Sequence, residues 1–449
     1  MPEATAEHTS AETCGCLQCE LDRDFEMPPE VQKACLDGEL VIFAGAGIST
    51  ESRMVVQHPL YLQMLLEVGM DPRESPSFPS VMTEYEALNG RGALLERIKE
   101  HLDYVQSFPN IDGEAGRFHS ALAGVYTIKD IVTTNWDDYF ERNCGAQPFV
   151  TEDDWAFWKS SKRKVFKLHG SISNPGSIVA TEADYKKCYR NLNQGLIGAR
   201  LKMLLATKTI VFVGYSLQDS DFAALYRPMK RRMGDLLPRA YIVTPFETEI
   251  PKFAEGMHLL RTSGLHFVET LKDGFPEDEL LPDERFAVLP LIRAEVRKLH
   301  HEMVEEGEMR CDPAMFMCAC YQDGLMDAFD HQMANAPKGD YFHRCYSEGL
   351  ARNVYEKLRG ERADEGVWHT VAYIEGYING LLFLIADDKT RESLPRYFIH
   401  DDHPDLHDLD EYHEAAKEFA RAAPDIFAYA KTQAEKLQPG VVFQHMPSI

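Results

Sequence analysis

The chain has 449 residues, of which 44% are hydrophobic and 27% are charged, and its formal net charge at pH 7 is −25. This length and composition predict a globular protein of two domains, each large enough to bury a core. The negative charge argues against general binding of nucleic-acid backbones, because that affinity comes from Lys and Arg side chains that neutralise phosphates. The runs 159–164 and 230–232 are candidate local basic patches, and solvated surface is the favoured interpretation of both.

The first 26 residues are polar and acidic and lack the basic start and apolar centre of a signal peptide. No run of about 18 uncharged apolar residues is found, so we expect no membrane span and a cytoplasmic protein. Cys14, Cys16 and Cys19 form one dense cluster, with Cys35 downstream. Four thiolates could hold zinc, but the second Cys-x-x-Cys pair of a strong zinc motif is missing. We therefore predict no metal.

The first buried strand is predicted over 39–45, where large apolar residues lead into a Gly-Ala-Gly turn. Such a strand exit is typical of phosphate binding, since Gly45 permits a tight turn and Gly47 lets the backbone approach a pyrophosphate. Ser49 is expected to cap the helix that follows. Thr50 stands in the place of the third glycine of a dinucleotide fingerprint, so this stretch alone does not separate a nucleotide site from a plain turn.

Three later apolar stretches also end in polar residues that can do chemistry: 130–137 (DIVTTNWD), 165–170 (VFKLHG) and 209–219 (TIVFVGYSLQD). Ligands of an open parallel sheet bind outside the carboxyl ends of its strands, so the four strand exits are predicted to form one site. Further strands are expected at 239–244 and 264–268, and helices at 84–106, 114–124, 194–206 and 220–232. This alternation predicts a doubly wound α/β fold without reference to any family.

The motifs GAGIS, TTNWD, KLHG and VGYSLQDSD resemble, in order and spacing, those of the sirtuin superfamily. The resemblance covers about 35–270 and is to the bacterial sirtuin-like branch that degrades NAD, often in anti-phage defence. It implies a Rossmann-like parallel sheet with NAD as the substrate. The residues then expected to bind NAD are Gly45, Ala46, Gly47, Ser49, Thr134, Asp137, Gly214, Tyr215, Ser216 and Asp219.

Two residues are expected to carry the chemistry. The Asn135 amide can donate and accept hydrogen bonds at once, which suits holding a ribose or positioning water. His169 is the predicted general base, because imidazole titrates near neutral pH, and the resemblance favours this role over a structural one. Two interpretations stay open for both Asp137 and Asp219, a contact to a ribose hydroxyl or a plain helix cap.

The sequence departs from the sirtuin deacetylases in two places. Their loop Gly-Ile-Pro-Asp-Phe-Arg, which covers the nicotinamide, is replaced at 52–58 by SRMVVQH. Their zinc ribbon, with two Cys-x-x-Cys pairs soon after His-Gly, is absent, and Cys188 stands alone. The sequence therefore favours an NAD glycohydrolase that needs no acceptor protein. The alternatives are an NAD-dependent deacetylase or ADP-ribosyltransferase, and a non-catalytic sensor of an NAD-type nucleotide.

The C-terminal part is predicted to be all helical, with one apolar stripe on a helix over 286–307 and a helix over 366–386 that is apolar nearly all round and is expected to be the buried centre. By analogy, we expect it to sense a trigger, or to assemble the protein as a homo-oligomer or with a partner defence protein. The His/Asp-rich stretch 400–408 is open to interpretation as a metal site or a solvated loop. The predicted parts are a flexible acidic segment (1–30), an NAD-binding domain (31–270), a linker (271–285) and a helical domain (286–449).

Overall fold

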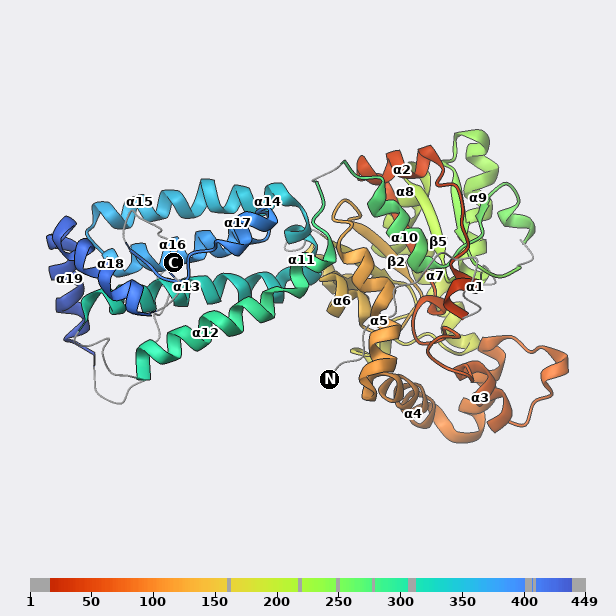
Figure 1. The fold of residues 1–449 in the computed structure, drawn as a ribbon. Coiled ribbons are helices and arrows are strands. Elements are labelled where there is room, and N and C mark those ends of the chain that lie inside the picture. The colour runs from red at the N-terminus through yellow and green to blue at the C-terminus, as the bar shows by residue number, and fades with distance from the viewer. Residues whose placement is uncertain are drawn as a thin grey trace. The chain divides into compact units, whose positions relative to one another are not determined.

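The computed structural model describes residues 17–159, 163–216, 220–247, 251–276, 279–305, 312–399, 406 and 409–437. The chain divides into two compact units, the first Met1–Phe275 with Pro337–Gly339 and the second Pro276–Ala336 with Asp340–Ile449. Among the described residues, every strand of the sheet lies in the first unit (Figure 1). The predicted domain boundaries remain predictions about which segments fold independently.

The first unit is built on one sheet of seven strands in the described part of the chain, in the order β3-β4-β2-β1-β5-β6-β7. All pairings are parallel. The strands are β1 (Leu40–Ala44), β2 (Asp130–Thr133), β3 (Gln147–Phe149), β4 (Lys164–Lys167), β5 (Thr209–Val213), β6 (Ala240–Val243) and β7 (His258–Leu260). Every residue of β1 is buried, as expected for a central strand covered on both faces.

Helices cover both faces of this sheet (Figure 1). The helices of the first unit are α1 (Leu17–Leu21), α2 (Pro29–Leu36), α3 (Leu60–Glu67), α4 (Phe78–Ser107), α5 (Pro109–Ala123), α6 (Tyr139–Cys144), α7 (Glu182–Gln194), α8 (Leu196–Thr207), α9 (Ser220–Met233) and α10 (Gly264–Asp273). Of these, α3 and α4 pack away from the sheet, in a hydrophobic cluster that contains no strand residue. Phe212 shares a core cluster with apolar residues of α7, α8 and α9. The next residue, Val213, points to the opposite face, where Gly264 of α10 lies against both Val213 and Phe118 of α5. The predicted doubly wound α/β fold is confirmed.

One predicted strand is wrong. Residues 264–268 begin helix α10, and the seventh strand is β7. Ser263 caps α10, because its Oγ accepts a hydrogen bond from the His266 amide at 3.1 Å. Phe267, Val268 and Leu271 are buried at helical spacing. A short apolar run is compatible with either structure, and here the serine cap favours the helix.

The second unit is helical throughout its described elements, which confirms the predicted all-α part. They are α11 (Asp283–Ala287), α12 (Leu289–Glu305), α13 (Pro313–Asn335), α14 (Arg344–Leu350), α15 (Glu356–Asp364), α16 (Trp368–Phe383), α17 (Asp388–Glu392), α18 (Leu409–Ala422) and α19 (Pro424–Ala434), with short 3-10 and π segments between them. A Cβ on Gly324 of α13 would lie 1.9 Å from the Tyr373 carbonyl oxygen of α16, so glycine lets these two central helices cross closely.

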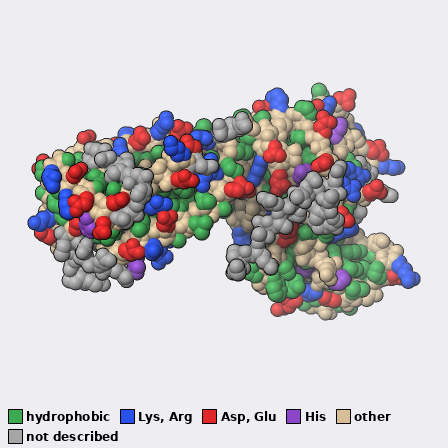
Figure 2. Space-filling view, in the orientation of Figure 1, with side chains coloured by type: hydrophobic (Ala, Val, Ile, Leu, Met, Phe, Trp, Pro, Cys, Tyr) green, Lys and Arg blue, Asp and Glu red, His purple; other side chains and the backbone are tan. Residues whose placement is uncertain are grey.

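Asp and Glu side chains spread over the face of the molecule seen in Figure 2. Within the predicted basic run 159–164, however, Arg163 is only 3% exposed. Its guanidinium donates hydrogen bonds to the carbonyls of Ala123, Val125, Ile128 and Cys144. Arg163 therefore belongs to the core, and the solvated interpretation of this position is wrong. Among the described residues, no helix is long and apolar enough to cross a membrane.

Candidate active site

The four predicted motifs leave four adjacent strands, β4, β2, β1 and β5, at the same edge of the sheet. Ala44 at the end of β1 pairs with Thr133 on one side and with Val213 on the other. Thr133 in turn pairs with Lys167 of β4. The four strands therefore end at the same height in the sheet, and the motifs begin at its carboxyl edge, where parallel sheets bind ligands.

The glycine turn after β1 packs directly against the turn after β5. The Gly45 amide donates to the Val213 carbonyl at 3.0 Å, and the Gly47 amide donates to the Gly214 carbonyl at 3.1 Å. A Cβ on Gly45 would lie 2.5 Å from the Gly214 oxygen, and one on Gly47 would lie 2.9 Å from it. Gly214 has a φ of 59°, which favours glycine. Close packing of the two turns thus gives a reason for these glycines that does not involve NAD.

Ser49 does not cap a helix, so that prediction is wrong. The turn continues as one short 3-10 segment, Ala46–Ile48, and the next α-helix begins only at Leu60. The Ser49 side chain is fully buried, and its hydroxyl donates to Asp137 Oδ2 at 2.8 Å. The Ser49 hydroxyl thus bonds to Asp137 in the segment that follows β2, and this hydrogen bond joins the first two motifs.

Asn135 extends this contact into a buried chain of three side chains. Its Nδ2 donates to Ser49 Oγ at 3.3 Å, and Ser49 donates in turn to Asp137. Because the Ser49 proton goes to the carboxylate, the amide must present its nitrogen to Ser49. Asn135 is 4% exposed, and its Oδ1 is buried with no hydrogen-bond partner in the described structure. A buried acceptor without a partner is costly, so this oxygen is suited to receive a ligand's donor.

Asp137 fits the cap interpretation in part, and its contact to a ribose hydroxyl remains a prediction. Its Oδ1 accepts a hydrogen bond from the Tyr139 amide at 3.4 Å, at the start of α6, while its Oδ2 is held by Ser49. Burial raises the pKa of the Asp137 carboxyl, and the positive charge of Lys167 and the Ser49 hydrogen bond oppose that rise. Both oxygens of the buried Asp137 carboxylate are therefore held in place by hydrogen bonds.

Lys167 is a site residue that the sequence analysis did not single out. Its side chain is 1% exposed, and its ammonium donates to the Asp137 carbonyl and to Glu141 Oε1, the latter at 2.9 Å. Burial raises the pKa of Glu141, and Lys167 opposes this shift. Lysine is rarely buried without a partner, so a lysine inside an apolar strand was the signal available in the sequence. Through its bond to the Asp137 carbonyl, Lys167 fixes the loop that follows β2.

His169 is fixed by contacts on both sides of its strand exit. Its carbonyl accepts hydrogen bonds from Trp136 Nε1 at 3.0 Å and from the Val179 amide at 2.9 Å. Its ring lies against that of Tyr185 on α7, with 4.9 Å between the ring centroids. The next residue, Gly170, has a φ of 87°. His169 is 5% exposed, and its role as general base remains a prediction.

The remaining residues predicted to contact NAD have different surroundings. The Thr134 amide donates to the Ala44 carbonyl at 3.4 Å. The Tyr215 ring packs on Phe43, with 4.8 Å between centroids, so it contributes to the aromatic core, whereas Ser216 is exposed. Asp219 lies outside the described residues. For Thr134, Tyr215, Ser216 and Asp219, NAD binding remains a prediction.

Glu51 anchors the segment that differs from the deacetylases. Its Oε1 lies 2.9 Å from Nε2 of His101 on α4, and its Oε2 accepts a hydrogen bond from the Leu60 amide at 3.0 Å. His101 is 3% exposed. The chain after the first motif is thus held at Glu51, immediately before the segment 52–58 that differs from the deacetylases. Sequence reasoning missed this pair because its members are distant in the chain.

The cysteine-based metal hypothesis gains no support from the described residues. Cys14, Cys16 and the Cys19 side chain lie outside them, as does the stretch 400–408 apart from Leu406. Cys35 is fully buried beside the Thr127 hydroxyl, and burial raises the pKa of its thiol to about 11. No group of three or more His, Cys, Asp or Glu residues able to hold a metal is found in the described part of the chain.

Comparisons with known proteins agree with the sirtuin resemblance of the motifs. The model of the SIR2-like domain family matches residues 129–267. A protein named NAD(+) hydrolase ThsA from Cytobacillus dafuensis is 28% identical over 211 residues, 46% of this chain and 41% of that protein. Its namesake from Enterococcus faecium is 29% identical over 192 residues, 41% of this chain and 38% of that protein. Defense-associated sirtuin 2 from Bacillus subtilis is 22% identical over 253 residues, 53% of this chain and 24% of that protein.

The chain thus spans less than half the length of these curated relatives. The matched region contains three of the four strand exits, those after β2, β4 and β5. The sirtuin resemblance of the motifs is confirmed: residues 129–267 of the first unit match the SIR2-like domain, and the relatives that the chain resembles include a protein named Defense-associated sirtuin 2.

Proposed function

We propose that the protein is an NAD glycohydrolase, which cleaves NAD into nicotinamide and ADP-ribose. The observation that carries this proposal is the buried Asn135–Ser49–Asp137 chain with the unpartnered Asn135 oxygen, at the edge where His169 also emerges. A ribose hydroxyl or the nicotinamide amide could supply the missing donor. The names of the relatives, NAD(+) hydrolase, support the same substrate.

In the proposed reaction, the bond between ribose C1′ and the nicotinamide ring nitrogen breaks. The nitrogen keeps the electron pair, so nicotinamide leaves as a neutral molecule and positive charge develops on the ribose. Water attacks C1′, and its proton passes to the His169 imidazole and then to solvent. Asn135 holds the ribose or the water, and Ser49 and Asp137 act as positioning residues that orient the Asn135 amide.

The deacetylase or transferase alternative lacks a visible acceptor platform. Only residues 171–181 separate His-Gly from α7, and this segment contains no cysteine. The segment is folded back on itself: the Ser171 amide donates to Ser177 Oγ at 3.0 Å, and the Val179 amide donates to the His169 carbonyl at 2.9 Å. The sensor alternative differs from the hydrolase only in the absence of turnover.

The test is to incubate the purified full-length protein with NAD, with and without an acetylated peptide, and to measure the products by liquid chromatography and mass spectrometry. Release of nicotinamide and ADP-ribose without peptide supports the hydrolase. Release that requires the peptide supports the deacetylase or transferase, and NAD binding without release under every trigger supports the sensor.

We further propose that the enzyme is a cytoplasmic effector of anti-phage defence. The motif resemblance and the name Defense-associated sirtuin 2 of one relative support this role. Residues 286–449 would sense the trigger or assemble the protein with itself or with a partner. Loss of cellular NAD after phage challenge, and the mass of the protein in solution before and after it, test the two parts of this proposal.

A further inference from the structure

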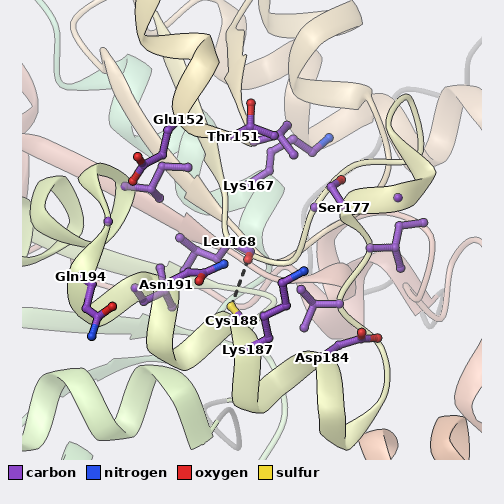
Figure 3. A pocket seen from close by; sticks show the side chains of 18 residues that line it. Thr151, Glu152, Lys167, Leu168, Ser177, Asp184, Lys187, Cys188, Asn191 and Gln194 are labelled. Carbon is purple, nitrogen blue, oxygen red and sulfur yellow. Dashed lines mark hydrogen bonds between the residues drawn. The ribbon is translucent and has the colours of Figure 1, made fainter.

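A cavity of about 580 Å³ lies beside the candidate active site, between the exits of β3 and β4 and helix α7 (Figure 3). Leu168 and Gly170, the two neighbours of His169 in the chain, line it. None of the residues predicted to contact NAD is among the described residues that form its wall. Its volume falls in the range of small-molecule sites, about 300–1,000 Å³.

One lysine in the wall of this cavity has no ion-pair partner among the described residues. The Lys167 ammonium is paired with Glu141, and the Asp184 carboxylate is paired with Arg91 at 2.7 Å. Glu152 Oε1 accepts a hydrogen bond from the Leu196 amide at 3.0 Å, which holds this carboxylate in place without neutralising its charge. Lys187, by contrast, makes no ion pair or hydrogen bond within the described structure.

The rest of the wall suits a molecule with an apolar body. Leu168, Ile178, Cys188 and Leu192 are all at most 8% exposed. Figure 3 shows the polar ends of Lys187 and Asn191 on either side of the Leu168 carbonyl, with the Lys167 ammonium turned away from them. The exposed side chains of Lys187 and Asn191 leave the cavity open to small solutes.

We propose that this cavity is a second ligand site, which binds a small organic monoanion through Lys187 and Asn191. The shared chemistry is one carboxylate, sulfonate or phosphate group attached to a ring or short chain. The anionic group pairs with the Lys187 ammonium and accepts a hydrogen bond from the Asn191 amide. The apolar body packs on Leu168 and Leu192.

Helix α7 connects this site to the His169 strand exit. The Cys188 thiol donates to the Leu168 carbonyl at 3.3 Å, and Tyr185 contacts the His169 ring. A ligand held by Lys187 on the same helix restrains the segment from Leu168 to Val179. Amide hydrogen exchange in this segment is therefore expected to slow when the site is occupied.

The test uses the full-length protein without NAD, so its outcome is independent of the proposed hydrolase activity. The probe is 8-anilinonaphthalene-1-sulfonate, whose sulfonate and rings match the site and whose fluorescence rises in apolar surroundings. Lys187→Met is expected to weaken saturable probe binding about 10- to 100-fold, the effect of losing a charge-assisted hydrogen bond. Lys186→Met is the matched control, because Lys186 is also exposed on α7 but does not line the cavity.

Benzoate and phenyl phosphate serve as competitors, and displacement by one or the other identifies a carboxylate or a phosphate as the preferred group. Probe bound at other apolar surfaces contributes equally to both lysine variants, so their difference reports on this cavity. Equal probe affinity in the Lys187 and Lys186 variants, no saturable binding to the native protein, or no displacement by either competitor would overturn the proposal.

Discussion

Replacing Lys167 by Met is expected to destabilise the first unit strongly. The substitution leaves the Glu141 carboxylate without its partner at 2.9 Å, in a site where that side chain is 18% exposed. Removing one member of a buried ion pair costs about 3–5 kcal/mol. Because Glu141 retains some access to water, we expect the lower end, about 3 kcal/mol, or about a hundredfold in the unfolding equilibrium constant.

Urea denaturation followed by tryptophan fluorescence measures this change. Three of the four tryptophans, Trp136, Trp155 and Trp158, lie in the first unit, so the signal reports mainly on it. The double variant Lys167→Met/Glu141→Gln removes both charges and is expected to recover about 1–2 kcal/mol of the loss.

Lys208→Met is the control for the loss of a surface ion pair. Lys208 pairs with Glu39 at 2.6 Å, but the Glu39 side chain is 51% exposed, so its loss should cost at most about 1 kcal/mol. If Lys167→Met is no more destabilising than Lys208→Met, the buried pair of Lys167 and Glu141 does not stabilise the first unit, and the argument from its burial is refuted.

Three further predictions concern pH, packing and charge. Burial lowers the pKa of His119 from 6.5 to about 3, so its contribution to stability is complete above pH 6.5 and is lost as the pH falls. His119→Gln should reduce the acid-side slope by up to about 1.4 kcal/mol per pH unit in urea titrations, and an unchanged slope would contradict this origin. Gly45→Ala should destabilise by about 1–3 kcal/mol, because its Cβ would lie 2.5 Å from the Gly214 oxygen. Gly92→Ala in α4, with no atom within 4 Å, should be neutral or stabilising, and equal effects would refute the packing argument. At about 0.15 M salt, the protein should bind NAD more tightly than random duplex DNA, since its net charge is −25. Salt-sensitive, sub-micromolar DNA binding in an anisotropy assay would reveal a basic groove instead.

The sequence was sufficient to predict that the four strand exits meet at one edge of the sheet. Each of these four strands is a buried apolar run that ends abruptly in a glycine turn or in Asn135 or His169. A parallel sheet brings such ends to one edge whatever the strand order, so neither the order nor the register was needed. The same regularity explains why the doubly wound fold was predicted correctly.

The partners of individual side chains could not be predicted in this way. Ser49 and Asp137 are 88 positions apart, and local propensity contains no information on such a pair. A helix cap was the best local interpretation of Ser49 until its tertiary partner was known. Arg163 likewise looked like solvated surface, because a run of basic residues does not reveal four backbone carbonyls that converge on one of them.

Nicotinamide release by the native protein and by its His169→Ala and Asn135→Ala variants tests the central claim most directly. It should be measured at equal concentrations of folded protein under activating conditions, or as cellular NAD after a phage challenge. Loss of a general base lowers turnover by about 10²–10⁴-fold, so the His169 variant should read as inactive. Calorimetry should find most NAD affinity retained in both variants, because the remaining motif residues still hold the nucleotide. Unchanged NAD consumption by folded His169→Ala protein would contradict the catalytic assignment.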